Sequence, residues 1–102
     1  MKYAIIDIET TGGSPKRDKI TEIAIYIHNG EEVVDEFVSL INPERYIPAF
    51  ITSLTGITNT MVEDAPRFYE IARKIVEITE DAVFVAHNVS FDYQFVKEEF
   101  RR

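Results

Sequence analysis

Three carboxylates in this sequence have the type and spacing of a divalent-cation site. Asp7 and Glu9 lie two residues apart in an apolar segment, and Asp92 follows a second apolar segment far along the chain. Side chains two apart in a strand point to the same face, so Asp7 and Glu9 repel each other unless a cation lies between them. The chain has no cysteine. Oxygen ligands without thiolates or a histidine cluster suit Mg²⁺ or Mn²⁺ and suit Zn²⁺ poorly.

Each carboxylate also has a simpler interpretation. Asp7 and Glu9 can simply mark where a strand meets water, and Asp92 in a first helical turn interacts favourably with the helix dipole, by about 0.3–1 kcal/mol. Their context favours a site. An apolar strand precedes Asp7, and Thr10-Thr11-Gly12 follows Glu9 at once, at the strand end where open α/β sheets place their ligands.

The elements that position these residues follow from apolar periodicity and turn residues. Apolar, β-branched runs predict strands, and His28-Asn29-Gly30-Glu31 predicts a hairpin, because Asn-Gly is the strongest short hairpin signal. Apolar residues at helical spacing predict a helix that Asp64 and Pro66 start, and Ser90 is expected to cap a second helix. The predicted strands are 3–8, 20–27, 33–40 and 82–86, the helices 67–78 and 91–100, and the short helical turns 48–54 and 58–62.

The predicted order of elements brings the three carboxylates together. Strand 3–8 is expected at the centre of a sheet, antiparallel hairpin strands beside it, and strand 82–86 parallel to it after a right-handed crossover. The start of helix 91–100 then opens beside the end of the first strand, which places Asp92 near Asp7 and Glu9. The predicted fold class is α/β with a mixed sheet.

Composition limits the possible functions. A chain of 102 residues is expected to form a single domain over residues 1–102. Eighteen acidic and eleven basic residues give a net charge of −7, which disfavours general binding of nucleic acid but suits carboxylates that capture metal ions and thereby attract phosphate. No segment is apolar enough for a membrane span or a signal peptide, so a cytoplasmic protein is expected.

Two motifs resemble those of a known enzyme family. Asp7-Ile8-Glu9-Thr10-Thr11-Gly12 resembles the Exo I motif of the DEDD (DnaQ-like) 3′→5′ exonucleases, and His87-Asn88-Val89-Ser90-Phe91-Asp92 resembles their Exo II motif. Ile41-Asn42-Pro43 and Leu54-Thr55-Gly56-Ile57-Thr58 resemble segments along the nucleotide site of the proofreading, epsilon-type subunits of bacterial DNA polymerase III. The likeness covers essentially the whole chain and implies a ribonuclease H-like fold.

The resemblance implies a mechanism and a role for each matching residue. Asp7, Glu9 and Asp92 would be catalytic and ligate two divalent cations, Mg²⁺ or Mn²⁺, roughly 3.5–4 Å apart. The reaction would hydrolyse terminal nucleotides from 3′ ends, of DNA rather than RNA, in proofreading beside a polymerase subunit. The implied substrate-binding residues are Thr10, Thr11, Thr55, Asn88 and Phe91, with Phe91 equally suited to the core.

The third motif of the family has no counterpart here. The family's fourth carboxylate and its histidine or tyrosine base lie downstream of Exo II, whereas His28 suits an exposed turn and His87 suits shaping of a loop. By this comparison the last strand and helix of the domain are missing. The chain alone is therefore expected to be nearly inactive, and to self-associate through strand 82–86 or through its last helix.

Two other functions stay open on the sequence alone. A phosphatase of the haloacid dehalogenase type also begins with an apolar strand that ends in an acid-x-acid motif, although that class uses Asp-x-Asp, and Glu9 and the second motif count against it. A catalytically silent module could keep the fold and use its acidic surface for a partner. The presence or absence of the third motif would separate this module from the enzyme.

Overall fold

The computed structural model describes residues 1–102 as four strands and four helices. The strands are β1 (Lys2–Thr10), β2 (Ile20–His28), β3 (Val33–Leu40) and β4 (Ala82–Val85). The helices are α1 (Ala49–Thr55), α2 (Asn59–Val62), α3 (Phe68–Thr79) and α4 (Val89–Arg101). No helix combines the length and the apolar character needed to cross a membrane.

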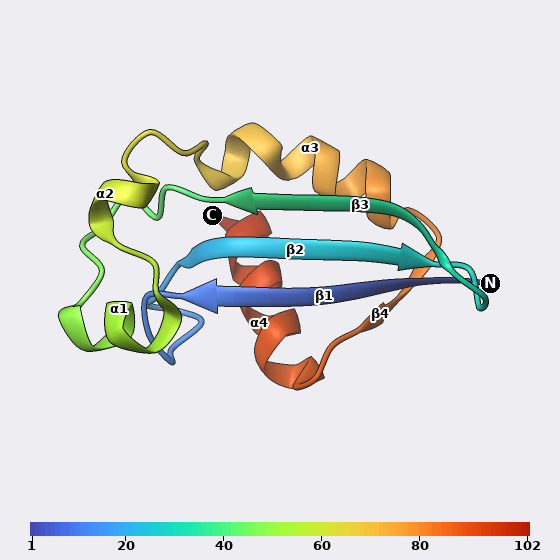
Figure 1. The fold of residues 1–102 in the computed structure, drawn as a ribbon, viewed down its shortest axis with the longest axis horizontal. Helices are drawn as coiled ribbons and strands as arrows, with labels where there is room; N and C mark the ends of the chain where they lie inside the picture. Colours follow the sequence, from blue (N-terminus) through green and yellow to red (C-terminus); the bar gives the residue numbers. More distant parts are fainter.

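The strands form one mixed sheet in the order β3-β2-β1-β4. β2 pairs antiparallel with both β1 and β3, whereas β4 runs parallel to β1. Figure 1 shows the sheet across the middle of the molecule, with α1 and α2 beyond the end of β1. The predicted topology is confirmed: β1 is central, 33–40 is a strand with the predicted ends, and a tight turn joins β2 to β3, with Gly30 at a φ of 101°.

The main core lies between one face of the sheet and the helices α3 and α4. In β1 the residues Ala4, Ile6 and Ile8 are buried, whereas Ile5 and Asp7 between them are exposed. Phe68, Ile75 and Ile78 of α3 and Phe95 of α4 pack on the buried face. β1 is thus covered on one side only, and its odd-numbered residues line an open face.

A smaller apolar cluster supports the segment between the sheet and α3. Ile47, Ile57 and Val62 are its buried members. Gly56 ends α1 with a φ of 78°, a left-handed conformation that glycine adopts without steric cost. The two predicted helical turns in this segment are confirmed, each with its start one residue later than expected.

The starts of both long helices differ from the predictions. α4 begins at Val89, and its N-cap is Asn88, whose side chain accepts a hydrogen bond from the Phe91 N–H at 3.4 Å. Ser90 lies inside the first turn, so its assignment as the cap is wrong. Arg67, and not Asp64 or Pro66, is the N-cap of α3, and its N–H donates to Glu70 at 2.8 Å. For α4, Asn and Ser have similar preferences for the N-cap position, so the sequence alone could not decide between Asn88 and Ser90.

Candidate active site

Asp7 and Glu9 lie on the open face of the sheet, near the end of β1. The alternation that buries Ile6 and Ile8 turns the side chains of Asp7 and Glu9 toward the opposite face. A register shift between Glu9 and Thr10 then interrupts the pairing with β2. The irregularity follows the two carboxylates directly, so they occupy the last regularly paired residues of β1.

The shortness of β4 makes room for Asp92. β4 pairs only with Lys2–Ile5, so the edge of β1 beyond Ile5 has no strand beside it. α4 starts in this space, with Asp92 in its first turn and buried to 6% exposure. The Ile8 backbone is among the groups that lower the pKa of the Asp92 carboxyl. α4 therefore brings the third carboxylate to the part of β1 that carries Asp7 and Glu9.

The three carboxylates influence one another electrostatically. Burial, followed by the charge of Asp7, raises the pKa of Asp92 above its ordinary value of 3.8, although its own backbone, His87 and Ile8 act in the opposite direction. Burial, followed by the charges of Asp7, Glu22 and Asp92, raises the pKa of Glu9 above 4.5. Residues from opposite ends of the chain thus form one acidic site, in which the ionised forms of Glu9 and Asp92 are disfavoured.

The site fits a divalent cation by charge and ligand type. Carboxylate oxygens are the ligands that Mg²⁺ and Mn²⁺ prefer, and a cation would relieve the charge repulsion that, after burial, raises the pKa values of Glu9 and Asp92. The side chains do not form a closed cage, because no three His, Cys, Asp or Glu side chains lie close enough together to enclose a metal ion. The three carboxylates therefore form an open site that does not enclose a metal ion.

Thr10 and Thr11 are held within the loop that follows β1. The Thr10 hydroxyl donates to the Gly12 carbonyl at 2.7 Å. The Thr11 hydroxyl donates to Asp18 at 3.0 Å and accepts from the Lys19 N–H, and the Thr11 N–H donates to the Lys19 carbonyl. Both side chains are buried. In this conformation Thr11 fixes the loop, and its contact with a nucleotide stays a prediction.

The other predicted substrate residues lie in different surroundings. The Thr55 hydroxyl donates to the Ile51 carbonyl and accepts from the Ile57 N–H, which fixes the end of α1. Asn88 caps α4 next to the acidic site. Phe91 packs on Phe95, with ring centroids 4.8 Å apart, and so contributes to the core. Their roles toward a substrate stay predictions.

Asp18 and Glu99 are two positioning residues that are absent from the site predicted from the sequence. Asp18 accepts hydrogen bonds from Thr11 and from the Ser14 N–H, and so organises the loop after β1. Glu99 lies on the buried side of α4 and accepts from the Ile20 N–H at 2.9 Å. For Glu99 a signal existed, because a carboxylate seven residues after Asp92 shares its helix face. Asp18 has no such signal.

The chain is similar in sequence to known nucleases. The family model described as "Exonuclease" (RNase_T) matches residues 4–102. The chain belongs to this exonuclease family. It is 44% identical over 102 residues to "3′-5′ exonuclease DinG" of Bacillus subtilis (strain 168), covering 99% of this chain and 11% of the relative. It is 42% identical over 101 residues to "DNA polymerase III PolC-type" of Caldanaerobacter subterraneus subsp. tengcongensis, covering 99% of the chain and 7% of the relative.

Solved exonuclease structures share the fold. A structure of exonuclease X with 5′ overhanging duplex DNA superposes with a TM-score of 0.74 at 29% identity, over 92% of this chain and 53% of the other. A structure of exonuclease I superposes with a TM-score of 0.84 at 20% identity, over 98% of this chain and 24% of the other. The ribonuclease H-like fold is therefore confirmed, and family membership sets the phosphatase alternative aside. The chain spans only a small part of the curated relatives that it matches.

Proposed function

We propose that the chain forms the metal-binding part of a 3′→5′ exonuclease that removes single nucleotides from DNA 3′ ends. The observation that carries this proposal is the placement of the three carboxylates: Asp7 and Glu9 lie on the open face near the end of β1, and α4 begins beside that end with Asp92 in its first turn. The names of the relatives, a 3′-5′ exonuclease and a DNA polymerase III of PolC type, support an exonuclease that proofreads beside a polymerase.

Each side chain has a defined task in this proposal. Asp7, Glu9 and Asp92 hold two divalent cations, Mg²⁺ or Mn²⁺. When bound, such ions activate water and stabilise the leaving oxygen of an in-line displacement. Thr10, Thr11 and Thr55 shape the place of the terminal nucleotide, Asn88 holds the first turn of α4, and Phe91 supports it from the core.

A test compares three DNA substrates with the protein in its complete natural form. A 5′-labelled single strand with a free 3′ hydroxyl should be shortened stepwise in Mn²⁺, whereas a 3′-phosphorylated copy should resist. Asp7→Asn should abolish shortening, and Asp64→Asn serves as the matched control, because Asp64 is an exposed aspartate whose charge is not among those that raise the pKa of Glu9 or Asp92. Cleavage of circular single-stranded DNA would show an endonuclease instead. Absence of any metal-dependent cleavage would favour the silent module.

A further inference from the structure

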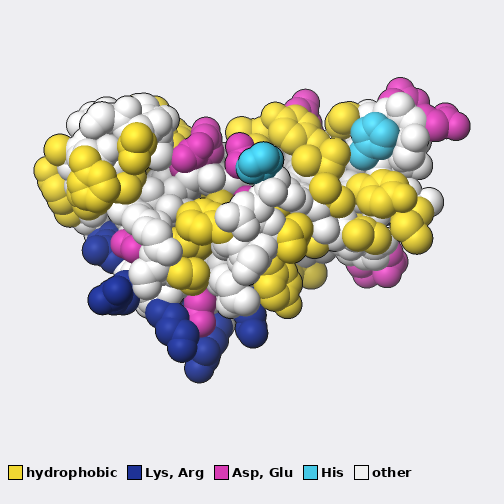
Figure 2. All heavy atoms as spheres, turned by 90° about the horizontal axis from the view of Figure 1, so that it is seen from below, with side chains coloured by type: hydrophobic (Ala, Val, Ile, Leu, Met, Phe, Trp, Pro, Cys, Tyr) yellow, Lys and Arg dark blue, Asp and Glu magenta, His cyan; other side chains and the backbone are white.

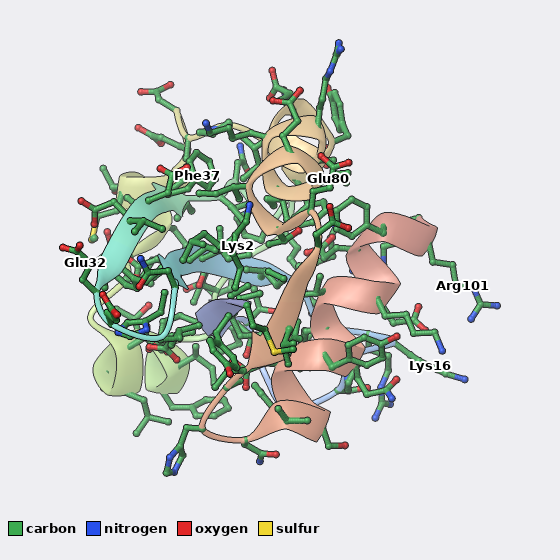
Figure 3. All side chains as sticks on the ribbon, turned by 90° about the vertical axis from the view of Figure 1, so that its right-hand side faces the viewer. Lys2, Lys16, Glu32, Phe37, Glu80 and Arg101 are labelled. Atoms are coloured by element: carbon green, nitrogen blue, oxygen red, sulfur yellow. The ribbon has the colours of Figure 1, made fainter.

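A basic groove lies between the loop after β1 and the outer flank of α4. It has a volume of about 570 Å³ and is lined by Ser14, Pro15, Lys16, Arg17, Gln94 and Glu98. Figure 2 shows Lys and Arg side chains gathered along the lower left edge of the molecule, with a few Asp and Glu side chains among them. In Figure 3, Lys16 and Arg101 project outward on the same side. The groove thus carries positive charge on a chain whose net charge is −7.

Lys16 and Arg17 are the cations that line this groove, and Arg17 donates a hydrogen bond of 3.5 Å to the Ser14 hydroxyl. Both are exposed, and neither forms an ion pair. The only carboxylate in the lining, Glu98, is paired with Arg101 at 3.5 Å. The local charge is therefore positive without internal neutralisation, which is the condition for attracting an anionic partner.

The backbone around the groove is fixed by α4. Arg102 donates hydrogen bonds to the carbonyls of Pro15, Lys16 and Asp18, at 2.9, 3.2 and 3.2 Å. The loop carrying Lys16 and Arg17 is therefore held against the end of α4 in the absence of a ligand. Binding there would order the two side chains but not the loop, which lowers its entropic cost.

We propose that this groove binds the sugar–phosphate backbone of a polynucleotide upstream of its 3′ end; the proposal rests on the proposed exonuclease function. Its walls are the two segments that carry the catalytic motifs: Lys16 follows Glu9 by seven residues, and Gln94 follows Asp92 by two. From Asp92 to Glu98 the helix rises about 9 Å, which equals between two and three stacked nucleotides at about 3.4 Å each.

The lining also distinguishes a polynucleotide from an acidic protein. A stable protein interface is anchored by large apolar or aromatic side chains at its centre, and the groove is lined by none. Gln94 and Glu98 lie on the flank of α4 away from the buried Asp92. The groove therefore holds backbone phosphates beyond the terminal nucleotide and leaves the terminal nucleotide to the carboxylate site.

The test is the salt dependence of oligonucleotide binding, measured by fluorescence anisotropy in chelator so that no cleavage occurs. The probe is a labelled single strand of about 16 nucleotides, the upper site size of single-strand-binding folds. The variant Lys16→Gln/Arg17→Gln is compared with Lys2→Gln/Lys74→Gln, which removes two exposed cations elsewhere that also form no ion pair. Each lost phosphate contact reduces the slope of log K against log salt by about 0.7.

We expect the slope of log K against log salt to be smaller by about 1.4 in the groove variant. If the affinities of the variant and the unmodified chain are equal at about 1 M salt, the variant binds about 25-fold more weakly at about 0.1 M salt. The control should keep the slope of the unmodified chain. Equal slopes in both double variants would overturn the proposal. Polyglutamate is the probe for an acidic protein. If the groove variant loses polyglutamate binding but keeps its oligonucleotide binding, the groove belongs to an acidic protein and the proposal is overturned. Because binding is measured without metal, a reduced slope supports the groove even where the cleavage assay fails.

Discussion

Replacing Glu99 with alanine is expected to lower the free energy of unfolding by about 1–3 kcal/mol. The Glu99 side chain is only 3% exposed, and one oxygen accepts the hydrogen bond of the Ile20 N–H at 2.9 Å. The other oxygen lies 3.4 Å from Arg102 and 4.0 Å from Lys19. Alanine removes the acceptor and leaves the Ile20 N–H, which lies in a buried part of the sheet, without a partner.

The magnitude follows from these contacts. An unsatisfied buried donor costs about 1–3 kcal/mol. The side chains of Lys19 and Arg102 are 23% and 29% exposed, so water solvates them after the change and their loss adds at most about 1 kcal/mol. Relief of the desolvation of the Glu99 carboxylate offsets part of this sum. For a chain of this size the melting temperature should fall by roughly 5–20 °C.

Urea unfolding of three variants tests this reasoning. Glu99→Gln keeps an oxygen acceptor for Ile20 and should lose less than about 1 kcal/mol. Glu77→Ala is the control, because Glu77 also pairs with an arginine in its own helix but is 60% exposed, so its removal should cost less than about 0.5 kcal/mol. Equal losses in Glu99→Ala and Glu77→Ala would refute the idea that Glu99 fastens α4 to the strands. If Glu99 holds α4 against β2, Glu99→Ala should also bind Mn²⁺ more weakly, because α4 carries Asp92.

Three further predictions concern the site, the loop and the sheet edge. Burial, with charge repulsion second, raises the pKa of Asp92 above 3.8 in the folded chain. The contribution of protonated Asp92 to the free energy of unfolding is therefore complete below pH 3.8 and is lost as the pH rises through the folded pKa. Asp92→Asn should thus be more stable than the unmodified chain near pH 7 in chelator, and an equal gain near pH 3 would contradict this. Gly12→Ala should cost about 1–3 kcal/mol, because a Cβ would lie 2.6 Å from an oxygen of Asp18, whereas Gly13→Ala meets nothing within 4 Å; urea unfolding of the pair decides. The chain should self-associate through β4, an edge strand on which Val83 is 46% exposed. Light scattering should show a smaller mass for Val83→Lys than for the unmodified chain. A monomeric unmodified chain would disprove this self-association.

The sequence predicted the elements whose signals are local. Alternating and continuous apolar runs predicted the four strands, and Asn29-Gly30 predicted the hairpin, in which the Asn29 side chain accepts from the N–H groups of Glu31 and Glu32. Asp7 and Glu9 were predicted to share a face because the strand period is two. Both are on the open face, with Asp7 exposed and Glu9 partly buried.

Contacts between distant segments could not be predicted in the same way. Glu99 and Ile20 are 79 residues apart in the chain, and no local pattern indicates that a helix carboxylate accepts a strand N–H. The hydrogen bonds of the Thr11 hydroxyl with Asp18 and Lys19 likewise depend on how the loop folds back. The resemblance to the family motif predicts that Thr11 contacts a nucleotide, whereas only the structure shows that its hydroxyl holds the loop.

The most direct test of the central claim is a calorimetric titration of Mn²⁺ into the chain and into Asp7→Asn. Asp64→Asn, which removes the same charge from an exposed loop, is the control. If Asp7, Glu9 and Asp92 hold the metal, the Asp7→Asn affinity should fall by at least about tenfold, and the control should bind as the unmodified chain does. Equal Mn²⁺ affinity in the unmodified chain and in Asp7→Asn would contradict the assignment of the site.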